Sequence, residues 1–208
     1  HSHGNIVTIY NPISMDPNQV ADFDALAKQY QLEENQYFYT VCSMHKHKNL
    51  ITLLKVMKKI KEENIDLPKK LVISGVGGPN KEVFAQQVKE MGIENDVLLT
   101  AFVSNEERNS LIKHSNIFLF PSIFEGFGMP PVEAMMLGKK VVTTSKTSLQ
   151  EVTMDQCSYV EDPFDVDEWI AQMKKMQGQP DKVVTFDQFK DTYAARQYLD
   201  LFYQVNQG

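Results

Sequence analysis

The chain has 208 residues, of which 42% are hydrophobic and 23% are charged, and its formal net charge is -6. This length suits one large domain with a substantial buried core, and the acidic balance argues against nonspecific nucleic-acid binding, which needs a basic face. No apolar run approaches the length of a membrane span, and no signal peptide is visible.

The hydrophobic pattern alternates between strands and helices along the chain. Residues 37–42 form an apolar stretch typical of a buried strand, and apolar side chains at 50, 53, 54, 57 and 60 predict one buried face on a helix over 49–60. Five further strands are expected at 69–75, 96–103, 116–122, 139–145 and 157–161. Four further helices are expected at 80–92, 104–114, 131–138 and 166–176, and an amphipathic segment at 186–205 ends the chain.

Residues at the helix ends support these boundaries. Ser104 and Glu107 form a capping box, and Asp165 caps the helix that follows it. Gly92 and Gly138 favour helix termination. Strands that are apolar throughout and separated by helices indicate a parallel sheet covered on both faces, so the predicted fold class is a doubly wound α/β domain. Ligands of such sheets bind beyond the carboxyl ends of the strands, near the point where the strand order reverses.

The loops after the first and second strands have different characters. The first offers Ser43, His45, Lys46, His47 and Lys48 directly before a helix. Cations beside a helix N-terminus suit a phosphate, although a solvated basic loop explains the same residues. The second contains Gly75, Gly77 and Gly78. The dinucleotide pattern G-x-G-x-x-G, begun by Gly75 and Gly77, fails because Asn80 stands at the position of its third glycine. We therefore expect no nicotinamide cofactor; a tight turn explains these glycines, which would also let a ligand approach the backbone closely.

The stretch FPSIFEGFGMPPVEA, residues 120–134, follows the fourth strand and contains two carboxylates. Glu125 lies in a loop, Gly126–Gly128 carry backbone N–H groups ahead of a helix, and Glu133 lies in the first turns of that helix. The amides and the helix dipole favour an anion, whereas Glu133 also fits a simple role at the positive helix end. Because carboxylates accept hydrogen bonds from vicinal hydroxyls, this loop predicts a phosphorylated sugar or a nucleotide as ligand.

Other candidate functional side chains are interpreted as structural. No acid or cysteine at the usual spacing completes a metal site with the histidines before residue 48. Cys42 and Cys157 lie far apart, so two reduced thiols are expected. Tyr159, Phe164 and Trp169 are interpreted as core aromatics rather than as a sugar-stacking surface. The opening HSHG is interpreted as a tag remnant.

The stretch PSIFEGFGMPPVEAMMLGKKVV resembles the signature of the retaining GT-B glycosyltransferases of family 4, with its two spaced glutamates. The stretches VCSMHKHKNL, LVISGVGG, VLLTAFVSNEE and TSLQEV also follow the order of that family. The resemblance covers most of the chain and is most specific at the paired glutamates. It implies a Rossmann-like doubly wound parallel sheet that forms one half of a GT-B two-domain architecture.

The resemblance implies a role for each matching residue. Glu125 and Lys48 are the expected catalytic residues, with Glu125 beside the donor sugar hydroxyls and Lys48 on the diphosphate. Glu133 would hydrogen-bond the ribose, and Val103 would touch the base through its backbone. No metal ligand is expected, since the family generally works without a metal. The expected donor-binding residues are Ser43, His47, Lys48, Gly75, Val103, Glu125, Gly126, Phe127, Gly128 and Glu133.

Three positions depart from the family pattern. Cys42 stands where glycine is common and is followed by Ser43 instead of arginine, so one expected diphosphate cation is missing. His47 stands where arginine often precedes Lys-Asn, and it would partly substitute. Lys139 and Lys140 stand in place of a small residue and proline. These departures bear on the strength of diphosphate binding and not on the fold.

The expected function is transfer of a sugar from a nucleotide diphosphate sugar to an acceptor hydroxyl with retention, in the synthesis of cell-surface polysaccharide or lipopolysaccharide. The nucleotide diphosphate sugar is the donor substrate, and no cofactor is expected. A glycosidase that uses the two acids is disfavoured by the anion-binding amides around them. A non-catalytic nucleotide-sugar-binding domain and a sugar-nucleotide epimerase of GT-B fold stay open as alternatives.

The resemblance also divides the chain. Residues 1–20 are expected to hold the tag remnant and an inter-domain connection, 21–185 the nucleotide-sugar-binding domain, and 186–208 a helix that packs toward an N-terminal domain. Family members are much longer than this chain, so that other domain would bind the saccharide or glycolipid acceptor, and this domain alone is expected to be inactive. The full-length protein is expected in the cytoplasm, with any contact to the inner membrane face made by the other domain.

Overall fold

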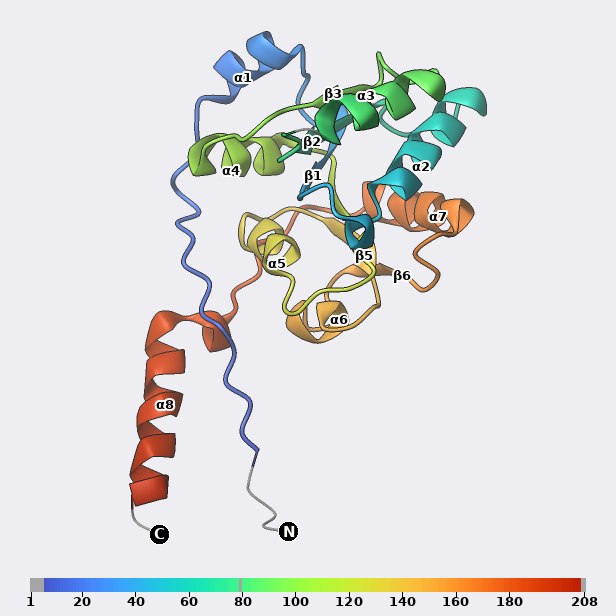
Figure 1. The fold of residues 1–208 in the computed structure, drawn as a ribbon. Coiled ribbons are helices and arrows are strands. Elements are labelled where there is room, and N and C mark those ends of the chain that lie inside the picture. Colours follow the sequence, from blue (N-terminus) through green and yellow to red (C-terminus); the bar gives the residue numbers. More distant parts are fainter. Residues whose placement is uncertain (1–5, 79, 207–208) are drawn as a thin grey trace.

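The computed structural model describes residues 6–78 and 80–206, so the tag remnant expected at residues 1–4 lies outside the described part. Its centre is a six-stranded sheet in the order β3-β2-β1-β4-β5-β6, and every neighbouring pair is parallel (Figure 1). The strands are β1 (Tyr37–Val41), β2 (Lys70–Ser74), β3 (Val97–Leu99), β4 (Ile117–Phe120), β5 (Val141–Thr144) and β6 (Ser158–Val160). The helices are α1 (Phe23–Tyr30), α2 (Leu50–Glu62), α3 (Asn80–Glu90), α4 (Asn105–His114), α5 (Met129–Met136), α6 (Leu149–Val152), α7 (Val166–Gln177) and α8 (Asp191–Asn206), with the short 3-10 turns η1 (Lys46–Lys48) and η2 (Asp187–Phe189).

Alternating side chains of the strands fill two cores on opposite faces of the sheet. Phe38 of β1 packs into the core formed with α2, α3 and α7, whereas Tyr37 and Tyr39 pack into the core formed with α1, α4, α5 and α6. Trp169 of α7 is fully buried in the first core, as expected, and its indole N–H donates to the Pro163 carbonyl at 3.1 Å. This covering on both faces confirms the doubly wound α/β fold and explains why the strands are apolar throughout.

The predicted helix boundaries rest on the interactions that the sequence indicated. The Ser104 hydroxyl accepts from the Glu107 N–H at 3.2 Å, and the Glu107 carboxylate accepts from the Ser104 N–H at 2.8 Å, which completes the capping box of α4. The Asp165 side chain caps α7 by accepting two backbone N–H groups. Gly92 and Gly138 follow α3 and α5 with φ of 70° and 85°, a conformation that favours glycine.

Three stretches differ from the expected elements. The strand expected at 96–103 ends at Leu99, because this edge strand pairs only with β2 and the chain then turns so that the Ala101 carbonyl accepts the Gly75 N–H. Helix α1 is not among the predicted elements, although its Asp22 cap and the apolar spacing of Phe23, Leu26 and Tyr30 signal a helix. The short helix α6 is also missing from the prediction.

The expectation of a buried Phe164 is wrong. Its side chain is 61% exposed. Phe164 lies in the turn before α7, where its own N–H donates to the Asp162 carboxylate, so the backbone of the turn and not a core contact fixes its position.

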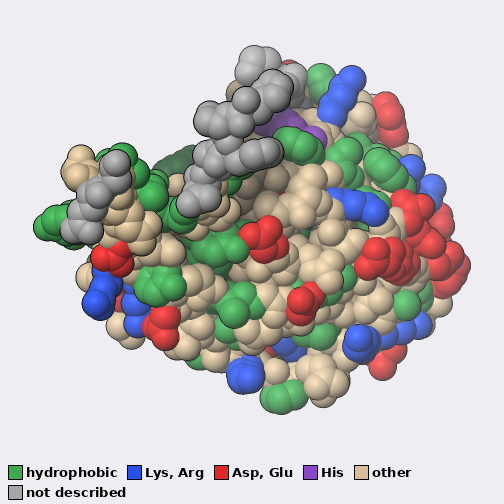
Figure 2. Space-filling model, turned by 90° about the horizontal axis from the view of Figure 1, so that it is seen from below, with side chains coloured by type: hydrophobic (Ala, Val, Ile, Leu, Met, Phe, Trp, Pro, Cys, Tyr) green, Lys and Arg blue, Asp and Glu red, His purple; other side chains and the backbone are tan. Residues whose placement is uncertain are grey.

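The last helix extends away from the rest of the domain, beside the N-terminal segment (Figure 1). On α8 only Ala194 is buried. The exposed large apolar side chains of this helix, toward the left of Figure 2, are Tyr193, Tyr198, Leu199, Phe202, Tyr203 and Val205. A helix with this many exposed aromatic and aliphatic groups presents a surface suited to contact with another part of a protein. Across residues 6–78 and 80–206, no helix is long and apolar enough to cross a membrane.

The capping box provides a test of the fold. Replacing Ser104 with alanine removes the acceptor of the Glu107 N–H, so we expect Ser104→Ala to lower the free energy of unfolding by about 1 kcal/mol. Urea unfolding followed by circular dichroism measures this change. The neighbouring exposed position serves as control, and Asn105→Ala is expected to change the free energy by less than about 0.5 kcal/mol. Equal effects of the two substitutions would contradict the assignment.

Candidate functional site

The reversal of strand order places two loops side by side at the carboxyl edge of the sheet. Strands β1 and β4 are neighbours at the centre, although α2, β2, α3, β3 and α4 lie between them in the sequence. The loop after β1 leads through η1 into α2, and the loop after β4 leads into α5. This is the edge at which doubly wound sheets bind ligands.

Lys48 and Glu125 meet across these two loops. The Lys48 Nζ lies 2.5 Å from the Glu125 Oε1, and the two side chains are only 17% and 12% exposed. The same ammonium group lies 5.6 Å from the centre of the Phe120 ring, at the end of β4. The His47 carbonyl accepts hydrogen bonds from the Ile123 N–H at 2.8 Å and from the Ser122 hydroxyl at 3.1 Å. The backbone therefore fixes the two loops against each other, and the ion pair lies at their junction.

The loop after Glu125 leaves backbone donors available. The Glu125 N–H donates to the Thr147 hydroxyl at 3.0 Å, and the Ser148 hydroxyl donates to the carbonyls of Glu125 at 3.2 Å and of Phe127 at 2.8 Å. Within the described part of the chain, no hydrogen bond is formed by the N–H groups of Gly126–Gly128. Side chains at the start of α6 thus fix the carbonyls of this loop, while its amides stay free for an anion.

The helix that follows contributes less to an anion site than its position predicts. Helix α5 begins at Met129, and Pro130 and Pro131 occupy its next two positions. Proline has no backbone N–H, so among the first four residues of the helix only Met129 and Val132 carry a donor. Helix α5 therefore offers few amides to an anion, and the loop amides of Gly126–Gly128 are the larger set.

Glu133 lies on α5 and pairs with a residue that the sequence had not suggested. Its Oε1 is 3.3 Å from the Arg108 Nη2 of α4, and the side chains are 12% and 20% exposed. Burial raises the pKa of the Glu133 carboxyl above its ordinary value, and the Arg108 guanidinium partly opposes that shift. The two glutamates of the motif therefore have separate cationic partners, Lys48 and Arg108.

Gly75 lies in the loop after β2 and contacts the loops after β1 and β3. Its φ is +87°, and a Cβ at this position would lie 2.8 Å from the Cys42 carbonyl oxygen, so the backbone approaches too closely for any other residue. Its N–H donates to the Ala101 carbonyl at 3.1 Å. Val103, two residues after Ala101, is buried in the loop before α4.

Three other predicted donor-binding residues take different places. Ser43 is exposed, and within the described residues its side chain makes no hydrogen bond. The His47 ring stacks on the His45 ring at 5.6 Å, while its carbonyl joins the two loops. The Phe127 ring packs edge-on against Tyr10 and Phe189, toward the terminal segments. Only the backbone of Phe127 is thus free for the site.

Sequence reasoning missed Arg108, Thr147 and Ser148. Thr147 and Ser148 are the first two residues of the stretch TSLQEV, whose order along the chain carries no information on their function. Arg108 lies one position after the capping box of α4, and a single arginine on a helix that begins with two glutamates gives no signal by itself. Only the packing of α4 beside α5 brings Arg108 to Glu133.

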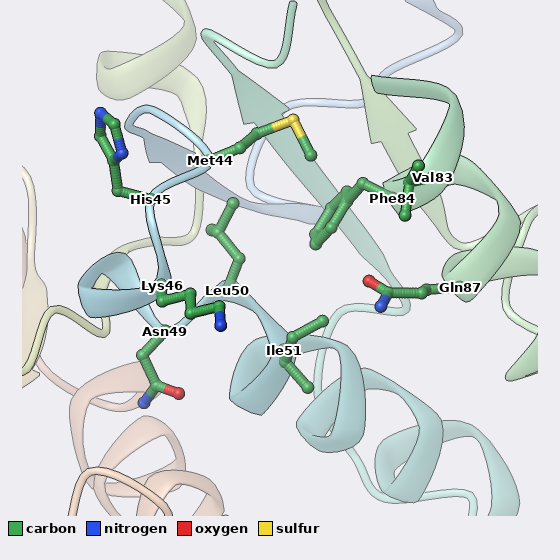
Figure 3. A pocket seen from close by; sticks show the side chains of 9 residues that line it. All are labelled: Met44, His45, Lys46, Asn49, Leu50, Ile51, Val83, Phe84 and Gln87. Carbon is green, nitrogen blue, oxygen red and sulfur yellow. The ribbon is translucent and has the colours of Figure 1, made fainter. Parts of the chain in front are cut away.

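A separate cavity of about 550 Å³ lies behind the loop after β1, between α2 and α3 (Figure 3). Its walls are mainly apolar, and Lys46 and Asn49 are among its polar side chains. Neither Lys48 nor the two glutamates of the motif line it. The apolar lining side chains are Met44, Leu50, Ile51, Val83 and Phe84. Because a nucleotide diphosphate needs cations and amide donors, the junction of Lys48 and Glu125 suits such a ligand better than this cavity.

The described residues contain no group of three or more histidine, cysteine or acidic side chains placed to hold a metal ion. Both cysteines are free thiols, as expected. Burial raises the pKa of Cys42 and of Cys157 to about 12, so neither is a thiolate at neutral pH.

A family model described as Glycosyl transferases group 1 matches residues 22–188, which include both glutamates of the motif and the loops around them. The chain belongs to this family. The resemblance to GT-B glycosyltransferases is thereby confirmed, and the fold is that of a C-terminal domain of such an enzyme.

Known proteins with this likeness are much longer than the chain. O-antigen chain mannosyltransferase B of Escherichia coli is 33% identical over 165 residues, which cover 78% of this chain and 42% of that protein. The structure of sucrose-phosphate synthase from Thermosynechococcus elongatus matches with a TM-score of 0.73 and 17% identity, over 94% of this chain and 52% of that one. The structure of Anabaena HepE in complex with UDP matches with a TM-score of 0.71 and 17% identity, over 94% and 57%. The chain thus spans about half the length of these proteins.

The two glycines of the motif provide a matched pair of substitutions. Gly128 has a φ of +98°, and a Cβ there would lie 2.5 Å from the Leu149 Cδ2, so we expect Gly128→Ala to lower the free energy of unfolding by about 1–3 kcal/mol. Gly126 has open space around it and no positive φ, so Gly126→Ala is expected to change that energy by less than about 0.5 kcal/mol. Chemical unfolding measures both. Equal stability of the two variants would refute the strained geometry at Gly128.

Proposed function

We propose that this chain is the nucleotide-sugar-binding domain of a retaining glycosyltransferase, which transfers a sugar from a nucleotide diphosphate sugar to an acceptor hydroxyl. The observation that carries the proposal is the Lys48–Glu125 pair beside the free amides of Gly126–Gly128. A cation and several backbone donors suit a diphosphate, and a buried carboxylate beside them suits sugar hydroxyls. The HepE structure is a complex with UDP, which supports the same ligand class.

The chemistry follows from the charges that develop during transfer. The bond between the anomeric carbon and the diphosphate oxygen breaks, that carbon forms a bond to the acceptor oxygen, and the acceptor hydroxyl loses its proton. Negative charge grows on the departing diphosphate, and Lys48 with the amides of Gly126–Gly128 stabilises it. Glu125 accepts hydrogen bonds from the donor sugar and holds Lys48 in place.

Retention predicts the same anomeric configuration in donor and product, which NMR coupling constants test.

The remaining residues act on the nucleotide. Glu133 accepts hydrogen bonds from the ribose hydroxyls, and the backbone of Val103 contacts the base. Because Gly75 has no side chain, the nucleotide can approach the backbone of this loop closely. Ser43 carries no charge, so Lys48 is the main cation for the diphosphate in this loop. The proposed mechanism needs no metal or organic cofactor.

The acceptor and the pathway are proposed from the relatives. The name of the Escherichia coli mannosyltransferase refers to an O-antigen chain, which supports synthesis of cell-surface polysaccharide or lipopolysaccharide. The acceptor, a saccharide or a glycolipid, is bound by an N-terminal domain, and the exposed apolar side chains of α8 pack on that domain. This chain alone therefore binds the donor without turnover, and the complete enzyme acts in the cytoplasm, with any membrane contact made through its other domain.

The environment of the two glutamates separates this function from a glycosidase. A glycosidase needs one protonated acid and one free carboxylate on either side of the sugar. Here each glutamate has its own cation, Lys48 for Glu125 and Arg108 for Glu133. A non-catalytic nucleotide-sugar-binding domain has the same site, and the absence of transfer by the full-length protein with a broad panel of donors and acceptors would favour it.

Two lysines of the same turn test donor binding. Lys48 lies in the ion pair at the loop junction, whereas Lys46 is exposed and lines the cavity between α2 and α3. We expect calorimetry with UDP, GDP, ADP and their sugar conjugates to detect one nucleotide that binds saturably. Lys48→Met should weaken that binding by about 10- to 100-fold, the effect of one lost charge-assisted hydrogen bond, and Lys46→Met should leave it within about twofold. If Lys46→Met has the larger effect, the proposed site is wrong.

A further inference from the structure

Arg108 is a half-buried cation at the proposed donor site with no evident structural purpose. It lies in the second turn of α4, directly after the capping box, and its Nη2 is 3.3 Å from the Glu133 Oε1 of α5. Its Nε is buried and has no hydrogen-bond partner among the described residues. Its weak contact with the Asn109 side chain, at 3.5 Å, adds little.

A purely structural role explains this pair poorly. Helices α4 and α5 share a core in which Leu111 and Ile112 of α4 pack with apolar residues of α5. Ion pairs with little solvent seldom stabilise a protein more than apolar side chains of the same size, because both charges lose hydration. Leaving the Nε unpaired makes the arrangement costlier still. The pair is better explained by what Arg108 does to the carboxylate of Glu133.

The charges around Glu133 indicate this effect. Burial disfavours the ionised form of the carboxyl, and the guanidinium of Arg108, from α4, is the charged group that counteracts it. Tyr39 of β1 also faces Arg108, but burial raises its pKa so that the hydroxyl stays neutral. Lys48 and Glu125, in the adjoining loops, neutralise each other.

We propose that Arg108 is a positioning residue of the donor site, which holds the Glu133 carboxylate ionised and oriented to accept hydrogen bonds from the ribose hydroxyls. This inference rests on the proposed function, because Glu133 has that role only if the chain binds a nucleotide. Arg108 then sets the lower pH limit of donor binding.

The test compares Arg108→Leu, Arg108→Lys and Glu133→Gln with the unmodified chain. Carbon-13 NMR of the glutamate carboxyls measures the pKa of Glu133, and calorimetry measures the affinity for UDP, GDP and ADP as a function of pH. Ionised Glu133 is the binding form, so affinity falls as the pH drops through its pKa. Arg108→Leu should raise that pKa, move the loss of affinity to higher pH, and weaken binding at pH 7 by about tenfold. Arg108→Lys should restore most of the affinity, and Glu133→Gln should bind weakly without this pH dependence.

A second α4 variant controls for changes in the helix itself. Lys113 donates to the Pro17 carbonyl at 2.8 Å, and Lys113→Leu should leave the pKa of Glu133 and the pH profile unchanged. The inference is overturned if folded Arg108→Leu keeps the original pKa and pH profile. If the unmodified chain binds none of the three nucleotides, the proposed function itself fails. The NMR titration needs no ligand, so it separates the two failures.

Discussion

The reversal of strand order at the centre of the sheet is the constraint on which the rest of this structure depends. Because β1 and β4 are neighbours, the loops that follow them must meet at one edge. The bonds from Ile123 and Ser122 to the His47 carbonyl then fix the distance between the loops. The position of Lys48 beside Glu125 is a consequence of the backbone and not of a long flexible side chain finding a partner.

The electrostatics of the site follow from this geometry. In a chain with a net charge of -6, the two glutamates of the motif are each paired with a cation, Lys48 or Arg108. The pairs keep Lys48 and Arg108 in place without a ligand. Since Ser43 offers no positive charge, the proposed diphosphate contacts are Lys48 and the free amides of Gly126–Gly128. This arrangement is consistent with a site that binds a charged donor and releases a more highly charged product.

The sequence predicted the fold well, because the fold depends on local patterns. Apolar strands, the capping box at Ser104 and the glycines that follow helices are signals that adjacent residues carry. Arg108 could not be predicted, because its importance depends on how α4 packs beside α5. Helix α5 offers fewer amides than a helix start usually does, because Pro130 and Pro131 carry no backbone N–H. Phe164 was misplaced because spacing alone cannot tell a turn from a buried helix face.

The most direct test of the donor site is to map nucleotide binding by amide chemical-shift changes in the isotope-labelled chain. The account predicts that a bound nucleotide diphosphate shifts the amide signals of Lys48, Gly126–Gly128 and Val103 most strongly. The amides around the cavity between α2 and α3, such as those of Ile51 and Phe84, should change little. The largest shifts at that cavity, or no shifts with UDP, GDP or ADP, would contradict the central claim.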